Sequence, residues 1–143
     1  MPTEDYTVPI GKAAIRRSGS DISVITYGAM VFLALDAAKE LEKEGIDLEV
    51  MDLRSLLPYD KEAVLESVKK TNKVILLHED TRTGGFAGEL AATIADEAFE
   101  YLDGPVRRIT APDTPVPYSP PLEEFFLPKV SDIVRVARDL NAF

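Results

Sequence analysis

The sequence has 143 residues, which is enough for one domain of ordinary size. It holds 25 Asp and Glu against 16 Lys and Arg, a formal charge of −9, so nucleic acids and anionic membranes would repel it on average and a basic partner suits it better. It has no cysteine and a single histidine, His78, which excludes disulfides, thiolate chemistry and histidine-cluster metal sites.

The first half of the chain alternates between strand-like and helix-like patterns. Residues 1–12 are polar and carry two prolines and a glycine, so we expect a linker from an absent upstream domain, followed by one domain over 13–143. In chain order the expected elements are a strand at 13–17, a strand at 21–27, a helix at 29–44, a strand at 47–53, a helix at 60–70 and a strand at 73–78. The first two strands are either neighbours in the sheet or separate after the turn between them.

The second half continues the alternation and contains its longest apolar stripe. That stripe predicts a helix at 85–101, followed by a strand at 106–110 and a closing helix at 130–140. Between these last two lies a loop at 111–128 that holds six of the ten prolines. Strands that alternate with helices of this length favour a mainly parallel sheet covered on both faces. The expected fold class is therefore α/β, in a three-layer α/β/α arrangement.

The sequence lacks segments that would span a membrane or direct export. Its apolar fraction of 45% and charged fraction of 29% are those of an ordinary globular domain. No apolar run approaches the roughly 20 residues of a membrane span, and the first residues show neither the basic nor the apolar stretch of a secretory signal. We therefore expect a cytoplasmic protein that binds neither nucleic acid nor membrane.

One loop concentrates residues that could carry chemistry. Ligands collect beyond the carboxyl ends of parallel strands, and the strand predicted at 73–78 ends on His78, with acids, Arg82 and the pair Gly84 and Gly85 directly after it. His78 could act as a proton shuttle, or the loop could place an anion at the start of the next helix. The plainer interpretation, which we favour, is that the glycines permit a tight turn and the histidine is hydrogen-bonded inside it.

Other familiar motifs of binding and catalysis are missing. The loop is neither a dinucleotide fingerprint nor a phosphate-binding P-loop, because G-x-G-x-x-G and Gly-Lys-Ser/Thr are absent. The sequence has no G-x-S-x-G, so it offers no nucleophile elbow. The acid pairs Glu79/Asp80 and Glu123/Glu124 could serve acid–base chemistry or a hard cation, but adjacent surface acids are more often simply solvated.

The end of the helix predicted at 85–101 is acidic. Asp96, Glu97, Glu100 and Asp103 cluster there, where the negative end of the helix dipole disfavours each carboxylate by a few tenths of a kcal/mol up to ~1 kcal/mol. The cluster is either a docking patch for a partner rich in Lys and Arg, since complementary charge speeds association and fixes register, or a solubilising surface. The residues alone do not separate these two interpretations.

Several segments together resemble one family over nearly the whole chain, the C-terminal domain of the β subunit of thiamine-diphosphate-dependent 2-oxo acid dehydrogenases. The segments that carry the resemblance are 8–31, 44–64, 78–99, 102–118 and the ending LP-x-V-x-x-I at 127–133. Within the family, His78-Glu79 with the segment 83–87 and Glu89 is more similar to the branched-chain (2-oxoisovalerate) members than to the pyruvate members.

The resemblance implies a fold for this domain and a cofactor site outside it. The fold is that of transketolase C-terminal domains, a five-stranded, mostly parallel sheet whose short first strand is antiparallel. Thiamine diphosphate and Mg are held elsewhere in the intact enzyme, which oxidatively decarboxylates a 2-oxo acid and acylates a lipoyl group with chemistry that belongs mostly to the cofactor. We therefore expect the isolated chain to be inactive and to hold no catalytic residue, with His78 as a weak candidate.

The resemblance also implies partners: the α subunit, a second β subunit, and the basic peripheral subunit-binding domain of the acyltransferase core. The docking role falls on Asp103 and on the chain-end carboxylate of Phe143, and the acidic cluster adds Glu100 and Glu97 as candidates. Gly104 stands where alanine is common. Separation from these partners would expose apolar surface, so homodimer formation stays open.

Three rival interpretations are kept. The chain could be the same domain of a pyruvate or acetoin dehydrogenase β subunit, or a self-contained small anion-binding α/β enzyme that uses residues 78–88. It could also be the C-terminal domain of another thiamine enzyme, such as a transketolase or a deoxyxylulose-phosphate synthase. The segments 82–86 and 112–118 speak against this last interpretation, by resemblance only.

Overall fold

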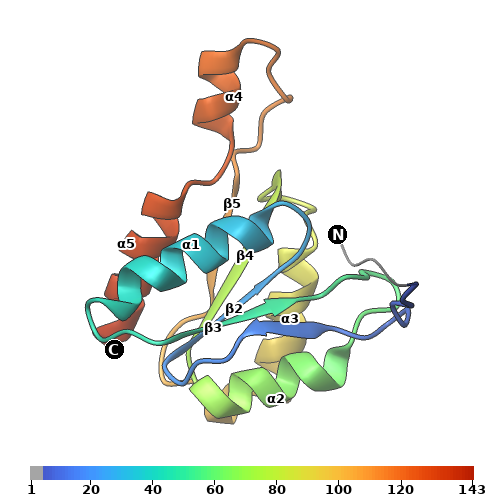
Figure 1. Ribbon diagram of the computed structural model, residues 1–143, viewed down its shortest axis with the longest axis vertical. Helices are drawn as coiled ribbons and strands as arrows, with labels where there is room; N and C mark the ends of the chain where they lie inside the picture. The colour runs from blue at the N-terminus through green and yellow to red at the C-terminus, as the bar shows by residue number, and fades with distance from the viewer. Residues whose placement is uncertain (1–4) are drawn as a thin grey trace.

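A computed structural model describes residues 5–143 and shows a sheet between two helical layers (Figure 1). The strands are β1 (Ala14–Arg17), β2 (Ile22–Thr26), β3 (Leu48–Asp52), β4 (Val74–Thr81) and β5 (Arg107–Ala111). The helices are α1 (Met30–Glu42), α2 (Lys61–Thr71), α3 (Ala87–Glu97), α4 (Pro120–Phe126) and α5 (Val130–Asn141), with a short 3-10 helix η1 (Phe99–Tyr101) after α3. Residues 1–4, part of the linker predicted at 1–12, lie outside the described residues. Among the described helices, none is both long and apolar enough to cross a membrane.

The sheet is mixed, with the strand order β1-β3-β2-β4-β5. Strands β2, β3, β4 and β5 pair in parallel, while β1 runs antiparallel to β3. The first two strands are therefore not neighbours, because β3 lies between them. The five-stranded, mostly parallel sheet with a short antiparallel first strand is confirmed.

Each face of the sheet has its own helical cover and its own core. On one face α1 and α5 bring Leu41 and Leu140 against the sheet, and both side chains are fully buried. On the other face α2 and α3 contribute Val68 and Ile94, which are also fully buried. The predicted three-layer α/β/α arrangement is confirmed, because the apolar stripes read from helical spacing are the faces that these helices bury.

The helix predicted at 85–101 is too long at its carboxyl end. α3 ends at Glu97, and Ala98 leaves the helical region with φ −141° before η1 begins. The chain leaves the axis of α3 here and turns toward the end of α2, where the backbone N–H of Asp103 donates to the carbonyl oxygen of Asn72 at 2.8 Å. A tertiary hydrogen bond therefore ends a stripe that its sequence pattern would continue.

The loop predicted at 111–128 is wrong over its second half, because α4 forms inside it. Two prolines begin this helix, and proline is well tolerated in the first helical turn, where its missing N–H would have no partner. Figure 1 shows α4 and its approach standing away from the sheet. Tyr118 on that approach is fully exposed and Phe125 in α4 is 78% exposed.

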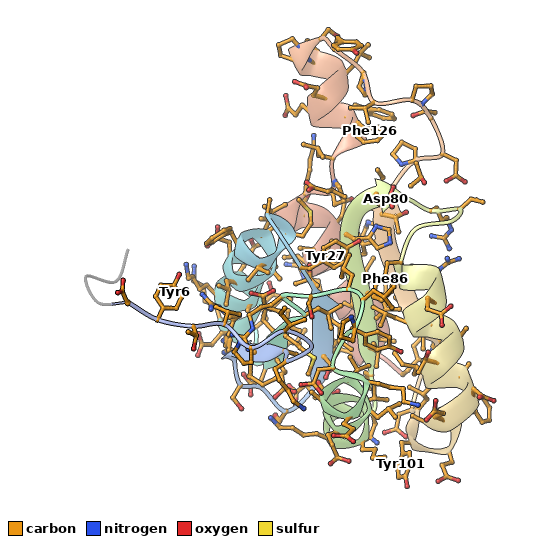
Figure 2. All side chains as sticks on the ribbon, turned by 90° about the vertical axis from the view of Figure 1, so that its right-hand side faces the viewer. Tyr6, Tyr27, Asp80, Phe86, Tyr101 and Phe126 are labelled. Atoms are coloured by element: carbon orange, nitrogen blue, oxygen red, sulfur yellow. The ribbon has the colours of Figure 1, made fainter. Side chains whose placement is uncertain are left out.

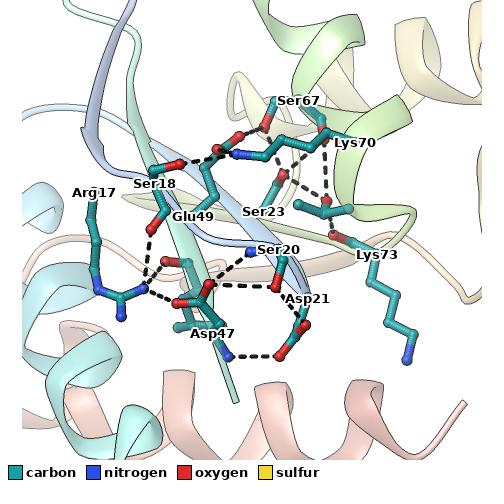
Figure 3. A network of polar contacts seen from close by, with 12 residues as sticks. Arg17, Ser18, Ser20, Asp21, Ser23, Asp47, Glu49, Ser67, Lys70 and Lys73 are labelled. Atoms are coloured by element: carbon teal, nitrogen blue, oxygen red, sulfur yellow. Dashed lines mark hydrogen bonds and ion pairs between the residues drawn. The ribbon is translucent and has the colours of Figure 1, made fainter. Parts of the chain in front are cut away.

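A buried polar network joins the sheet to α2 (Figure 3). Glu49 in β3 is 3% exposed, and its carboxylate pairs with the Lys70 ammonium and accepts a hydrogen bond from Ser67 Oγ at 2.7 Å. Ser23 in β2 continues the network through hydrogen bonds with the hydroxyls of Ser67 and Thr71, at 2.6 and 2.7 Å. The carboxylate is thus buried with its countercharge and a hydroxyl donor in place, as buried charges require.

A second part of the network in Figure 3 fixes the turn between β1 and β2 where it crosses the start of β3. Arg17 Nη1 donates to Asp47 Oδ1 at 2.6 Å, and the Asp47 N–H donates to Asp21 Oδ2 at 2.8 Å. The turn passes so close to β3 that a Cβ on Gly19 would overlap the backbone of Leu48. Only glycine fits at position 19, because any side chain would overlap the backbone of β3.

Candidate functional site

His78 lies inside the protein, on β4 near the carboxyl edge of the sheet. It is 1% exposed, its ring stacks on Tyr27 with centroids 6.1 Å apart, and its Nδ1 accepts the N–H of Asp80 at 3.1 Å. Its Nε2 has no hydrogen-bond partner among residues 5–143. Gly85 covers the ring, because a Cβ there would lie 2.7 Å from His78 Cε1. This arrangement favours the tight-turn interpretation.

The electrostatic surroundings keep this imidazole neutral. Burial lowers the pKa of His78, the positive charge of Arg108 lowers it further, and the carboxylate of Asp80 opposes both. Because Nδ1 is an acceptor, we place the proton of the neutral ring on Nε2. Burial, with the charges of Asp80 and Glu79, raises the pKa of the neighbouring Tyr27 hydroxyl. A neutral, enclosed histidine is poorly suited to shuttle protons to a ligand outside.

The depressed pKa of His78 predicts a pH-dependent stability. Below its ordinary pKa of about 6.5 the histidine takes up a proton in the unfolded chain but not in the folded one. The free energy of unfolding is therefore expected to be complete above that pH and to fall as the pH drops from 6.5 to 5.5. Urea denaturation at pH 8, 7, 6 and 5.5 measures this decline, and H78Q is expected to flatten it. An equal decline in H78Q would assign it to other groups.

The rest of the loop is fixed to the segment after β5, a connection that sequence reasoning missed. The Thr83 N–H and Oγ1 donate to the two carboxylate oxygens of Asp113, at 2.8 and 2.7 Å. These two hydrogen bonds lower the pKa of Asp113. Glu79 and Asp80 are exposed, as expected for solvated surface acids.

The acidic cluster lies at the opposite end of α3. Figure 2 shows Asp80 and Phe86 near the start of this helix and Tyr101 beyond its other end. An 11-residue helix is about 16 Å long. Both α3 and α5 return antiparallel to the strands they follow, so Asp103 and Phe143 come to the amino edge of the sheet, away from the edge where ligands were expected.

Asp103 and the chain end lie close to one another. The Asp103 backbone is held by the bond to Asn72, whose Nδ2 also donates to the carbonyl oxygen of Tyr101 at 2.6 Å. A Cβ on the next residue, Gly104, would lie 3.0 Å from Leu140 Cδ1 and 3.4 Å from Phe143 Cβ. The Phe143 side chain therefore packs on the Asp103-Gly104 turn, so the two residues named from the resemblance lie in the same part of the surface.

The other members of the acidic cluster differ in their surroundings. Asp96 and Glu100 are exposed, but the Glu97 carboxylate accepts two hydrogen bonds from Lys61 Nζ, at 2.9 and 3.1 Å. Hydrogen bonding to Glu97 and its charge raise the pKa of Lys61. Glu97 is thus already paired, whereas Asp103 and Glu100 form no ion pair among residues 5–143.

A shallow depression of about 510 Å³ adjoins Asp103. Its lining is mainly apolar and includes Ala91, Ala95, Phe99, Leu102 and Val106. Phe99 is 74% exposed although it lies in a folded segment. An apolar floor with a carboxylate at its rim suits a long basic side chain, whose methylenes contact the floor while its charge meets the acid.

Comparison with known families places nearly the whole chain in one domain type. Residues 11–133 match the family described as "Transketolase, C-terminal domain". The chain is 45% identical over its full length to the 2-oxoisovalerate dehydrogenase subunit beta of Bacillus subtilis (strain 168), and covers 44% of that protein. Two further B. subtilis proteins are equally close. The β subunit of acetoin:2,6-dichlorophenolindophenol oxidoreductase is 45% identical over 98% of this chain, and the match spans 41% of that protein. The pyruvate dehydrogenase E1 component subunit beta is 44% identical over the full chain, and the match spans 44% of that protein.

Solved structures agree with the fold. A split-gene transketolase described as an inactive β4 tetramer superimposes with a TM-score of 0.82 and 28% identity, over 96% of this chain and 44% of that one. A transketolase from Pichia stipitis superimposes with a TM-score of 0.61 at 19% identity, over 92% of this chain and 18% of that one, which supports the fold alone. The chain spans less than half the length of all these proteins.

Proposed function

The chain belongs to the transketolase C-terminal domain family, and from that premise we propose that it is the assembly and docking domain of the β subunit of a 2-oxo acid dehydrogenase. The β subunits to which it is 44–45% identical over its whole length support this proposal. The observation that carries the docking role is the convergence of Asp103 and the chain end beside an apolar depression.

The proposal covers the class of 2-oxo acid dehydrogenases rather than one substrate. Identities to the 2-oxoisovalerate, acetoin and pyruvate β subunits differ by one percentage point. The preference for branched-chain substrates expected from the segment around His78 therefore stays a prediction. It is tested by assaying the intact enzyme with branched-chain 2-oxo acids and pyruvate side by side.

Thiamine diphosphate is proposed to be bound by parts of the enzyme outside this chain. When bound, it supplies the decarboxylation chemistry. Within residues 5–143 there is no cluster of three or more His, Cys, Asp or Glu side chains that could hold Mg²⁺, and the loop that follows β4 encloses its histidine. The residues present do not fit this cofactor, so we derive no catalytic step from them. The rival of a self-contained enzyme gains no support from His78.

The partners follow from the same premise. We propose contacts with an α subunit, with a second β subunit, and with the basic peripheral subunit-binding domain of the acyltransferase core, in the cytoplasm. The last partner is proposed to place a basic side chain over the depression, so that its charge meets Asp103 and the Phe143 carboxylate. Charge complementarity of this kind makes association fast and sensitive to salt.

Docking is tested by titrating the chain with a basic peripheral subunit-binding domain in a calorimeter at several salt concentrations. D103A is expected to weaken binding at least tenfold at low salt, because the carboxylate that lines the apolar depression is lost. The matched control is D36A, which removes an exposed acid from α1 and is expected to leave the affinity within twofold. Binding that ignores salt, or that D103A and D36A reduce equally, would refute this role.

A further inference from the structure

Four of the eight arginines in this acidic chain gather around β5. Arg82 lies in the loop between β4 and α3, Arg107 and Arg108 lie in β5, and Arg135 lies in α5. All four line one depression of about 340 Å³. Arg82 and Arg108 also line a second depression of about 560 Å³ at the start of α3. A chain of net charge −9 thus carries a local concentration of positive charge.

Arg82 and Arg108 are held together by a reciprocal pair of hydrogen bonds. Arg82 Nη1 donates to the carbonyl oxygen of Arg108 at 3.3 Å, and Arg108 Nη1 donates to the carbonyl oxygen of Arg82 at 3.4 Å. Each guanidinium has five N–H donors, and within residues 5–143 only one donor of each group forms a hydrogen bond. These two long, exposed hydrogen bonds restrict the side chains before any ligand arrives, which lowers the entropy lost on binding.

No direct ion pair neutralises this pair within the described residues, although carboxylates lie nearby: the pKa of Asp113 is lowered first by its hydrogen bonds from Thr83 and in part by the charge of Arg82. Across the part of the chain that the structure describes, neither Arg82, Arg107 nor Arg108 forms an ion pair, while Arg135 reaches Asp132 only at 3.6 Å. Like charges held side by side repel one another. A bound anion would remove this repulsion and use the free donors.

We propose that Arg82 and Arg108 bind a compact, multiply charged anion of the phosphoryl class in the depression that they share with Gly84, Gly85 and Gly88. The guanidinium fork matches phosphate oxygens in pairs. Gly88 leaves open space beside the pair, since a Cβ there would meet only Arg108 Nη1, at 3.7 Å. The α3 start next to the pair adds backbone N–H groups that favour negative charge.

The surroundings favour a compact anion over an extended acidic peptide. Glu89 lines the same depression, and Asp113 and Asp139 line the neighbouring ones. These carboxylates surround the arginines and would repel an acidic chain that extended beyond them. A compact anion presents less negative charge to these carboxylates than an extended acidic chain would.

This site is independent of the proposed docking role. It lies at the start of α3, whereas Asp103 follows the other end of this helix, so about one helix length separates the two. Anion binding here does not require the acyltransferase core or the α subunit. Failure of one proposal therefore leaves the other standing.

The test is calorimetric titration of the 143-residue chain with sodium pyrophosphate at constant ionic strength, with orthophosphate, ADP and a glutamate decapeptide titrated in parallel. Saturable binding of pyrophosphate is expected, weakened at least tenfold in R82Q and in R108Q. The matched control is R16Q, which removes an exposed arginine of β1 and is expected to stay within twofold. Circular dichroism melting checks that all variants fold, and amide shifts of Gly84, Gly85 and Gly88 are expected on binding.

Each alternative result has a stated meaning. Equal weakening in R16Q and R108Q, or no saturable binding of pyrophosphate by the folded wild type, would overturn the proposal. Tighter binding of the glutamate peptide than of pyrophosphate would also overturn it, in favour of an acidic protein partner. If ADP binds more tightly than pyrophosphate but loses affinity in the same two variants, the site is a phosphate site for nucleotides.

Discussion

Replacing Lys70 with methionine is expected to destabilise the domain by about 3 kcal/mol, because the Glu49 carboxylate then stays buried without its countercharge. This is the lower end of the range for buried pairs, since the Lys70 side chain is 45% exposed and water screens its charge. Ser67 Oγ would remain its hydrogen-bond donor, but one hydroxyl does not replace an ammonium group. Urea denaturation at pH 7 measures the loss. The same network includes Ser23 and Thr71, so the loss of the Lys70 charge is expected to disturb hydrogen bonds as far as β2, the central strand of the sheet.

A matched lysine separates the buried pair from surface charge in general. Lys39 pairs with Asp36 three residues earlier, and both side chains are more than half exposed. K39M is expected to change stability by less than about 1 kcal/mol. The double variant E49Q/K70M is expected to recover most of the stability lost in K70M, because no buried charge remains. A K70M protein as stable as K39M would show that Glu49 does not depend on this pair.

Replacing Gly85 with alanine is expected to have the second large effect, a loss of about 3 kcal/mol. A methyl group there would overlap the carbonyl oxygen of Thr81 and approach His78 Cε1 to 2.7 Å. Neither neighbour can move freely, because one is backbone and the other is a ring packed on Tyr27. Thermal and urea unfolding measure the cost, and G85A is also expected to disturb the proposed anion site.

The neighbouring glycine provides the control. Gly84 has φ +78° and a Cβ there would meet no heavy atom within 4 Å. G84A is therefore expected to lower the free energy of unfolding by roughly 1–2 kcal/mol, the cost of a left-handed backbone for alanine. If G84A proves more destabilising than G85A, the requirement at this turn is backbone conformation rather than space for the histidine ring.

Much of the fold follows from local patterns. Each predicted strand and helix of the alternating βα region is present, because apolar spacing records which face of an element is buried. The errors have non-local causes. The break at Ala98 depends on a hydrogen bond from Asp103 to Asn72, and α4 forms where a count of prolines suggests a loop although prolines at a helix start are favourable.

The sites were less predictable than the fold. The resemblance named Asp103 and Phe143, but their approach to one another is seen only in the structure, because residues 40 positions apart show no local signal of contact. The pairing of Arg82 with Arg108 was missed for the same reason. The signal that could have found it was the parallel order of β4 and β5, which puts the loop after one strand beside the other strand.

The position of β3 between the first two strands has a consequence for how this chain is made. β1 and β2 emerge from the ribosome joined by a turn of four residues, yet neither can pair with the other. Both strands form their first hydrogen-bonded pair with β3, which follows α1 and ends at Asp52. The sheet therefore has no first pair of strands until the whole segment 14–52 has been synthesised, and its smallest nascent unit is three strands and a helix that close together.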